Sequence, residues 1–197
     1  MEKPKAFDTL NLAIFASGNG SNAMNIINYF ENEPKVNVKK VFCNKPKAPI
    51  IEKAKGRGIE TVLFNKSQLQ ESDFVLNELK VHSIDYIILA GFLLKIPENL
   101  IKHFEDRIIN IHPALLPKYG GKGMYGMHVH EAVVQNKEPK TGITIHYVNK
   151  NYDEGAIIFQ AECAVLKTDT AKDVAAKIHE LEMENFPRLI RQVLLGD

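Results

Sequence analysis

The chain has 197 residues, of which 45% are hydrophobic and 25% are charged, and its formal net charge at pH 7 is +1. This length and composition predict one globular domain, residues 1–197, that can bury a sizeable core. Because 25 basic residues are interspersed with 24 acidic ones, the sequence lacks the dense basic face of a duplex-binding protein. The composition therefore argues against a nucleic-acid partner and favours small-molecule substrates.

The N-terminal residues, Met1 to Asp8, lack the apolar core of a signal peptide. No window of the chain approaches the roughly 18 consecutive apolar residues of a membrane span. The two cysteines, Cys43 and Cys163, are too few for a disulfide framework. We therefore expect a cytoplasmic protein with reduced thiols and no membrane association. Residues 1–10 precede the first strand pattern, and we expect this extension to be poorly ordered.

Apolar runs alternate with helical patterns through the first half of the chain. This βαβα order predicts an α/β fold with a doubly wound, mostly parallel sheet and right-handed crossovers. The expected strands cover residues 11–16, 37–43, 60–64, 85–90 and 107–111, and the expected helices cover residues 22–30, 48–57, 71–81 and 97–104.

The pattern changes after Pro113. A loop rich in glycine and proline is followed by a helix expected over residues 128–135. Two strands at residues 142–148 and 156–165, flanking a turn-forming segment, predict an antiparallel C-terminal hairpin. A long C-terminal helix is expected over residues 170–195, with a cap at Asp169 or Thr170 and an interruption at Pro187.

The segment Asn110-Ile111-His112-Pro113 carries the clearest signal for catalysis. Because side chains alternate along a strand, Asn110 and His112 should point to the same side, and Pro113 favours an extended backbone at His112. Both side chains would lie at the carboxyl edge of the sheet, where open α/β folds bind their ligands. An amide, an imidazole and a later carboxylate such as Asp153 can stabilise an oxyanion and move a proton. Asp153 also lies in turn-forming sequence, so the pattern leaves open whether it is a turn residue or reaches His112.

Residues 17–23 read Ser-Gly-Asn-Gly-Ser-Asn-Ala and lie at the first strand-to-helix junction. Glycines let the backbone approach a phosphate, and a helix N-terminus favours an anion. Two alternatives remain, namely a tight turn without a ligand and an NADP site in which Lys45 meets the extra phosphate. We favour a phosphate monoester site with side-chain donors from Ser21 and Asn22.

Histidines at positions 128 and 130, together with His112 and His146, raise the question of a metal site. Two helical residues at this spacing point about 200° apart, so they chelate one ion poorly. No cysteine or carboxylate completes a recognisable ligand set. We therefore expect no metal.

Several segments, in order along most of the chain, resemble phosphoribosylglycinamide formyltransferase, the folate-dependent transformylase of purine biosynthesis. The Asn-x-His-Pro signature and the aspartate are shared by the wider formyltransferase superfamily, whereas the first glycine loop narrows the resemblance to the glycinamide ribonucleotide branch. The resemblance implies the Rossmann-like formyltransferase fold. The matching segments are Ser17-Gly18-Asn19-Gly20-Ser21-Asn22, Leu89-Ala90-Gly91-Phe92, Asn110 to Tyr119, Gly142 to Val148 and Tyr152-Asp153-Glu154-Gly155.

The resemblance implies transfer of the formyl group of 10-formyltetrahydrofolate, a co-substrate, to the amine of glycinamide ribonucleotide by a monomer or homodimer. It implies three catalytic residues, Asn110, His112 and Asp153. The phosphate and ribose of the substrate would be bound by Gly18, Asn19, Gly20, Ser21, Asn22, Lys118, His128 and Glu182. The folate would be bound by Leu93, Leu94, Lys95, Ile96, Asn110, Asn149, Asn151 and Asp153.

Two features depart from the family pattern. Many members carry a basic residue where this chain has Leu94, and the glycine-rich residues 120–126 lengthen the loop before His128 into a candidate lid. The rival functions are formyl transfer to another acceptor or to water, and nucleotide binding by a non-catalytic domain built on the same sheet. The second rival gives no reason for Asn110, His112 and Asp153 to occur together.

Overall fold

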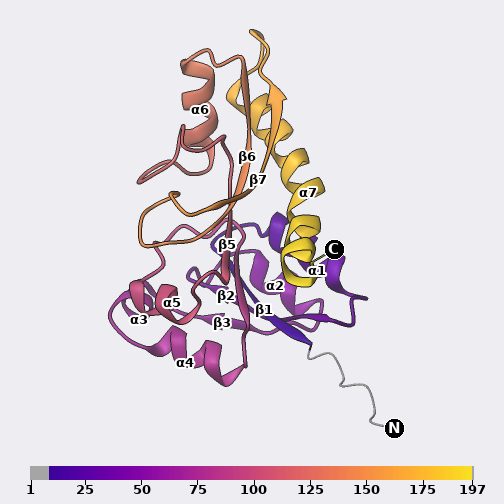
Figure 1. Ribbon diagram of the computed structural model, residues 1–197, viewed down its shortest axis with the longest axis vertical. Helices are drawn as coiled ribbons and strands as arrows, with labels where there is room; N and C mark the ends of the chain where they lie inside the picture. The colour runs from indigo at the N-terminus through magenta and orange to yellow at the C-terminus, as the bar shows by residue number, and fades with distance from the viewer. Residues whose placement is uncertain (1–8, 197) are drawn as a thin grey trace.

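The computed structural model describes residues 9–196, in which a seven-stranded sheet carries helices on both of its faces (Figure 1). The strands lie in the order β3-β2-β1-β4-β5-β6-β7 across the sheet. Residues 1–8 of the expected N-terminal extension lie outside the described residues, and Leu10 already belongs to the first strand. The strands are β1 (Leu10–Ala16), β2 (Val36–Cys43), β3 (Thr61–Leu63), β4 (Tyr86–Leu89), β5 (Ile108–His112), β6 (Lys140–Tyr147) and β7 (Ile157–Ala164).

Strands β1 to β5 pair in parallel, as the alternation of strand and helix patterns predicts. Strand β6 pairs antiparallel with both β5 and β7, so the predicted hairpin is confirmed. The register between β5 and β6 sets Asn110 directly opposite His146. The direction of winding reverses between β1 and β4, and such a switch point is where open α/β sheets form their ligand crevice.

Successive side chains of the central strands point to opposite faces of the sheet, and both sets are apolar. Helices therefore cover both faces. Leu12 and Ile14 of β1 pack with α1, α2, α6 and α7, whereas Ala13 and Phe15 pack with α3, α4 and α5 on the other face. The helices are α1 (Ser21–Phe30), α2 (Ile50–Lys55), α3 (Lys66–Gln70), α4 (Phe74–Val81), α5 (Glu98–His103), α6 (Met127–Gln135) and α7 (Ala171–Leu195).

The connection between β3 and β4 contains two helices where the sequence pattern predicts one over residues 71–81. Helix α3 opens with a capping box, in which the side chains of Asn65 and Gln68 each accept from the backbone N–H of the other at 2.8 Å. Helix α4 then begins at Phe74. An Asn-x-x-Gln pattern before an apolar residue is the sequence signal for the additional helix.

Helix α7 runs without a break from Ala171 to Leu195, so the predicted interruption at Pro187 is wrong. A proline removes the N–H that would bond to the carbonyl four residues earlier, here that of Met183. Asn25 of α1 supplies a replacement donor, because its Nδ2 lies 2.8 Å from the Met183 carbonyl oxygen. Of the two predicted caps, Asp169 and Thr170, the helix uses Thr170.

Candidate active site

A cavity of about 630 Å³ opens at the carboxyl ends of β4 and β5, a volume suited to small-molecule ligands. Segments far apart in the sequence supply its walls. They are the ends of the two strands, the segment after β4, the glycine-rich loop before α6, the turn between β6 and β7, residue Asn22 of α1 and one face of α7.

Asn110 and His112 occupy the same side of β5, as strand alternation predicts, and both line the cavity. His112 is 4% exposed, and its Nε2 lies 2.7 Å from the carbonyl oxygen of Tyr119. A carbonyl only accepts, so Nε2 carries the proton and Nδ1 is the nitrogen left facing the site. The Asn110 Nδ2 lies 3.1 Å from Nε2 of His146 on β6.

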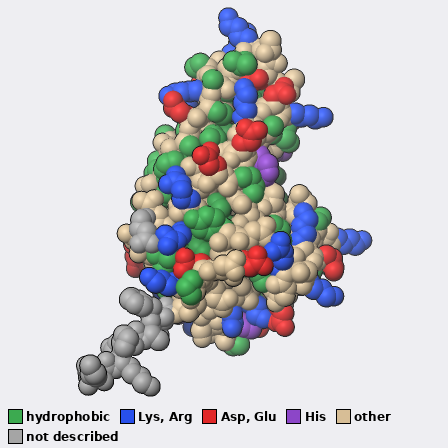
Figure 2. Space-filling view, turned by 90° about the vertical axis from the view of Figure 1, so that its right-hand side faces the viewer, with side chains coloured by type: hydrophobic (Ala, Val, Ile, Leu, Met, Phe, Trp, Pro, Cys, Tyr) green, Lys and Arg blue, Asp and Glu red, His purple; other side chains and the backbone are tan. Residues whose placement is uncertain are grey.

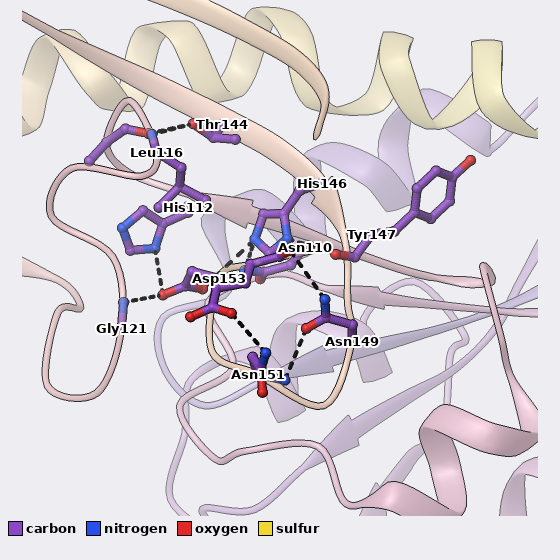
Figure 3. Close-up of polar contacts among 12 residues, drawn as sticks. Asn110, His112, Leu116, Gly121, Thr144, His146, Tyr147, Asn149, Asn151 and Asp153 are labelled. Carbon is purple, nitrogen blue, oxygen red and sulfur yellow. Dashed lines mark hydrogen bonds and ion pairs between the residues drawn. The ribbon is translucent and has the colours of Figure 1, made fainter. Parts of the chain in front are cut away.

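Asp153 lies between the two histidines (Figure 3). Its Oδ2 is 3.7 Å from Nδ1 of His112, and its Oδ1 is 3.8 Å from Nε2 of His146. The N–H of Gly121 donates to Oδ2 at 2.8 Å, which ties the glycine-rich loop to the same carboxylate. The side chain is 14% exposed. Amide, imidazole and carboxylate thus meet at one wall of the cavity.

Asp153 is both a turn residue and a partner of the histidines, so the two readings of the sequence are compatible. Its φ of 55° is left-handed, a conformation that aspartate tolerates better than most residues. Asn149 braces this turn, because its Oδ1 accepts from the Asn151 N–H at 2.9 Å and its Nδ2 donates to the Glu154 carbonyl at 3.1 Å. Gly155 is required at the next position, since a Cβ there would lie 1.7 Å from the Tyr147 carbonyl oxygen.

The first glycine loop adjoins the cavity at the start of α1. Gly20 precedes the helix with a φ of 75°, and a Cβ there would lie 2.5 Å from the Ile50 side chain, so only glycine fits. Lys53 of α2 donates to the side chain of Asn19 at 2.7 Å and to its carbonyl at 2.9 Å. The loop is therefore held between two helices, with the first turn of α1 beside the cavity.

Ser17 links the ends of three strands and was not singled out by the sequence analysis. Its hydroxyl donates to Asn44 Oδ1 at 2.7 Å, after β2, and accepts from the N–H of Leu93 at 3.1 Å, after β4. These bonds fix the segment that begins at Gly91 against β1. The apolar wall of the cavity is positioned in this way.

Glu182 of α7 contacts Asn22 at the wall of the cavity. The Asn22 Nδ2 donates to Glu182 Oε2 at 2.9 Å, and Nδ1 of His179 lies 3.8 Å from the same oxygen. Burial raises the pKa of Glu182. Asn22 Oδ1 is buried and finds no hydrogen-bond partner within residues 9–196. A buried acceptor without a partner beside a cavity is a site that a ligand donor can satisfy.

Among residues 9–196, no group of three or more histidine, cysteine, aspartate or glutamate side chains is placed to hold a metal ion. No helix in the described part of the chain is long and apolar enough to cross a membrane.

The family model for formyl transferases matches residues 10–190. The chain belongs to the formyl transferase family. The crystal structure of a phosphoribosylglycinamide formyltransferase from Anaplasma phagocytophilum superposes on it with a TM-score of 0.86 at 30% identity, covering 95% of this chain and 87% of the other. The seven-stranded architecture is therefore the formyl transferase fold.

Curated relatives carry the same name. Over 183 residues the chain is 37% identical to the chloroplastic phosphoribosylglycinamide formyltransferase of Arabidopsis thaliana, covering 88% of this chain and 63% of that protein. It is 33% identical over 189 residues to the phosphoribosylglycinamide formyltransferase of Bacillus subtilis, covering 92% of this chain and 93% of that protein. The chain spans less than two thirds of the length of the plant relatives it matches.

Within this formyl transferase, most residues singled out from the sequence line one cavity. Gly18, Asn19, Gly20 and Ser21 are not part of its wall, although they lie in the loop that leads to Asn22. The predicted residues that line the cavity are Asn22, Leu93, Leu94, Lys95, Ile96, Asn110, His112, Asn149, Asn151, Asp153 and Glu182.

Lys118 and His128 are not among the residues that line the cavity. The side chain of Lys118 is 68% exposed, and its Nζ lies 3.0 Å from Glu138 Oε1. The side chain of His128 is 65% exposed and its Nδ1 lies 3.6 Å from Glu131 Oε2. Each side chain lies near a carboxylate outside the cavity wall, and its role in substrate binding stays a prediction.

His130 lines the cavity, and the sequence analysis considered it only as a metal ligand. It is 6% exposed, and its Nδ1 has no hydrogen-bond partner among the described residues. Burial lowers the pKa of His130. Residues two positions apart on a helix point to different faces. This spacing is the sequence signal that could have predicted different surroundings for His128 and His130 on α6.

Glu182→Gln is expected to stabilise the protein at pH 8. Because the folded state raises the pKa of Glu182 above the ordinary glutamate value of 4.5, folding stability from this group falls as pH rises through the folded pKa. Glutamine removes that penalty and still accepts from Asn22, so the melting temperature should rise by about 2–4 °C per kcal/mol of penalty removed. The difference should vanish below pH 4.5.

Thermal unfolding at pH 8 and at pH 4 measures this effect. Glu184→Gln, at an exposed position on the same helix, is the matched control and should leave the melting temperature nearly unchanged at both pH values. A Glu182→Gln protein that melts below the wild type at pH 8 would contradict the assignment of a buried, destabilising charge.

Proposed function

We propose that this formyl transferase moves the formyl group of 10-formyltetrahydrofolate to the amine of glycinamide ribonucleotide. The products are formylglycinamide ribonucleotide and tetrahydrofolate, in purine biosynthesis. The observation that carries the proposal is the convergence of Asn110, His112 and Asp153 on one cavity that Glu182 and Asn22 also line. The names of the bacterial and plant relatives support the same reaction.

The reaction begins when the amine nitrogen attacks the formyl carbon, and the formyl oxygen becomes an oxyanion. Asn110 donates an N–H to this oxyanion, and His112 lies beside the same centre with its free Nδ1 facing Asp153. The intermediate collapses when the bond from the formyl carbon to N10 of the folate breaks. One proton leaves the amine and one reaches N10, and His112 with Asp153 carries this transfer.

Three physical effects supply the rate. A positioned oxyanion donor contributes roughly 10²–10³, and positioned acid–base groups contribute roughly 10²–10⁴. Holding the two substrates in contact supplies much of the remainder, because it removes the entropy cost of their encounter.

The cavity suggests how both substrates bind. The phosphate binds at the loop from Gly18 to Asn22 and the N-terminus of α1, and the ribose hydroxyls hydrogen-bond to Glu182. The flat ring of the folate lies along the wall from Leu93 to Ile96, with its polar edge at the turn from Asn149 to Asp153. This arrangement places the amine of the ribonucleotide next to the formyl carbon of the folate, beside Asn110 and His112.

The proposed partners are these two small molecules, and the enzyme acts as a monomer or homodimer in the cytoplasm. Nucleic acid is not proposed as a partner, since basic and acidic side chains are interspersed on the face shown in Figure 2. The Arabidopsis thaliana relative is named as chloroplastic, and we do not propose this compartment for the present protein.

A spectrophotometric assay of folate deformylation tests the proposed acceptor. We expect deformylated folate to appear only when glycinamide ribonucleotide is present. Release at an equal rate without an acceptor would indicate hydrolysis, and release only with a sugar nucleotide amine would indicate another acceptor. Either of these results would overturn the proposal, and so would no release at all.

Inorganic phosphate is expected to compete with glycinamide ribonucleotide and not with the folate. The N–H groups at the start of α1 would bind either phosphate, so the apparent KM for the ribonucleotide should rise in proportion to the phosphate concentration while kcat stays constant. Chloride at matched ionic strength is the control. If phosphate and chloride act alike, the glycine loop does not hold the substrate phosphate.

A further inference from the structure

His146 lies outside the three residues that the reaction assigns, yet it is built into the same wall of the cavity. It sits on β6 directly opposite Asn110 in the antiparallel register and is 2% exposed. Both of its ring nitrogens have close partners. Nδ1 lies 2.8 Å from the Tyr147 carbonyl oxygen, and Nε2 lies 3.1 Å from Asn110 Nδ2 (Figure 3).

These two contacts fix the proton on the ring. A carbonyl oxygen only accepts, so Nδ1 of His146 carries the hydrogen, and a neutral imidazole then has a bare Nε2. Nε2 therefore needs a donor, and the Asn110 amide supplies one of its two N–H groups. Burial lowers the pKa of His146, which favours this neutral form.

Two backbone carbonyls thus hold the rings of His112 and His146 in opposite orientations. The Tyr119 carbonyl holds the proton on Nε2 of His112, and the Tyr147 carbonyl holds it on Nδ1 of His146. His112 turns its Nδ1 toward Asp153, and His146 turns its bare Nε2 toward Asn110.

We propose that His146 is a positioning residue that fixes the orientation of the Asn110 amide. With Nδ2 held by the histidine, its second N–H remains for the oxyanion that forms in the cavity. A flipped amide would set its oxygen against the bare Nε2, an unfavourable meeting of two acceptors, and would present oxygen to the oxyanion. This inference rests on the proposed function, because the oxyanion belongs to that reaction.

The neutral ring of His146 also preserves the pairing of Asp153 with His112. Its Oδ1 is 3.8 Å from Nε2 of His146, while its Oδ2 is 3.7 Å from Nδ1 of His112. A proton on Nε2 would draw the carboxylate toward His146 and would leave Asn110 facing a second donor. The position of the proton on the His146 ring therefore sets the orientation of both the Asn110 amide and the Asp153 carboxylate.

A matched pair of variants separates positioning from packing. His146→Gln places an acceptor near the position of Nε2, whereas His146→Asn reaches only the position of Nδ1 and can restore only the bond to Tyr147. We expect the Asn variant to lose about 10²-fold in kcat, the scale of one oxyanion donor. The Gln variant should recover most of this loss. KM for both substrates should stay within about twofold of wild type in each variant, since both ring nitrogens of His146 bond to protein groups. Equal losses in both variants would overturn the proposal.

The second measurement needs no turnover. In ¹⁵N-labelled wild-type protein, with the His146 signals assigned by their loss in His146→Gln, we expect a protonated Nδ1 and an unprotonated Nε2 at pH 7. A protonated Nε2 would overturn the proposal. If the wild type transfers no formyl group, the proposed function fails by itself, and the tautomer measurement still decides whether His146 accepts from Asn110.

Discussion

Asp153→Asn should lower kcat by about 10²–10⁴-fold, the scale of positioned acid–base catalysis, while KM for both substrates changes little. Asparagine keeps an oxygen for the N–H of Gly121, and its amide nitrogen takes the place of Oδ1, 3.8 Å from Nε2 of His146. The turn should therefore stay intact. What disappears is the negative charge 3.7 Å from His112 Nδ1, which in the proposed mechanism supports proton transfer through His112.

Steady-state kinetics with both substrates measures this loss, and thermal unfolding checks the fold. Glu154→Gln is the matched control, because it alters the neighbouring carboxylate of the same turn, which accepts from Asn151 at 2.7 Å and contacts neither histidine. Its kcat should stay within about twofold of wild type. An Asp153→Asn enzyme with nearly normal turnover would remove this carboxylate from the mechanism.

His112→Ala is expected to reduce kcat by about 10²–10⁴-fold as well, because it deletes the group through which Asp153 acts. In the proposed arrangement the substrates bind mainly through the glycine loop, Glu182 and the apolar wall, so their KM values should rise far less. Removing both residues should cost little more than removing one, since groups that act as a unit are not additive.

The control is His103→Ala on α5, an exposed position remote from the cavity lining, which should leave kcat unchanged. Binding of each substrate to the His112→Ala protein is measured by calorimetry. If both substrates fail to bind while the protein remains folded, His112 is a binding residue and its catalytic role is wrong.

The sheet and one half of the site could be predicted from local patterns. Apolar runs such as Tyr86–Leu89 identify buried strands, and alternation alone places Asn110 and His112 on one side of β5. Such patterns repeat over a few residues, so a single sequence contains them in full. The resemblance to formyltransferases then added Glu182 and the link between Asp153 and His112, which no local pattern shows.

The remaining features depend on contacts between distant segments. Whether Asp153 reaches His112 follows from a left-handed turn and from Gly121, 32 residues away. The role of His146 follows from the β5–β6 register, and its position within an apolar strand gives no hint of a partner. The continuous helix at Pro187 could not be predicted for the same reason, because the donor that replaces the missing N–H comes from Asn25, on another helix.

The most direct test of the central claim follows the transferred atom itself. We would mix the enzyme with 10-formyltetrahydrofolate carrying ¹³C in its formyl group and with glycinamide ribonucleotide, and record carbon spectra of the products. The label should appear as the formamide carbon of formylglycinamide ribonucleotide, and in Asp153→Asn it should stay on the folate over the same interval. Label that appears as free formate, or that remains on the folate with the wild-type enzyme, would contradict the proposed transfer.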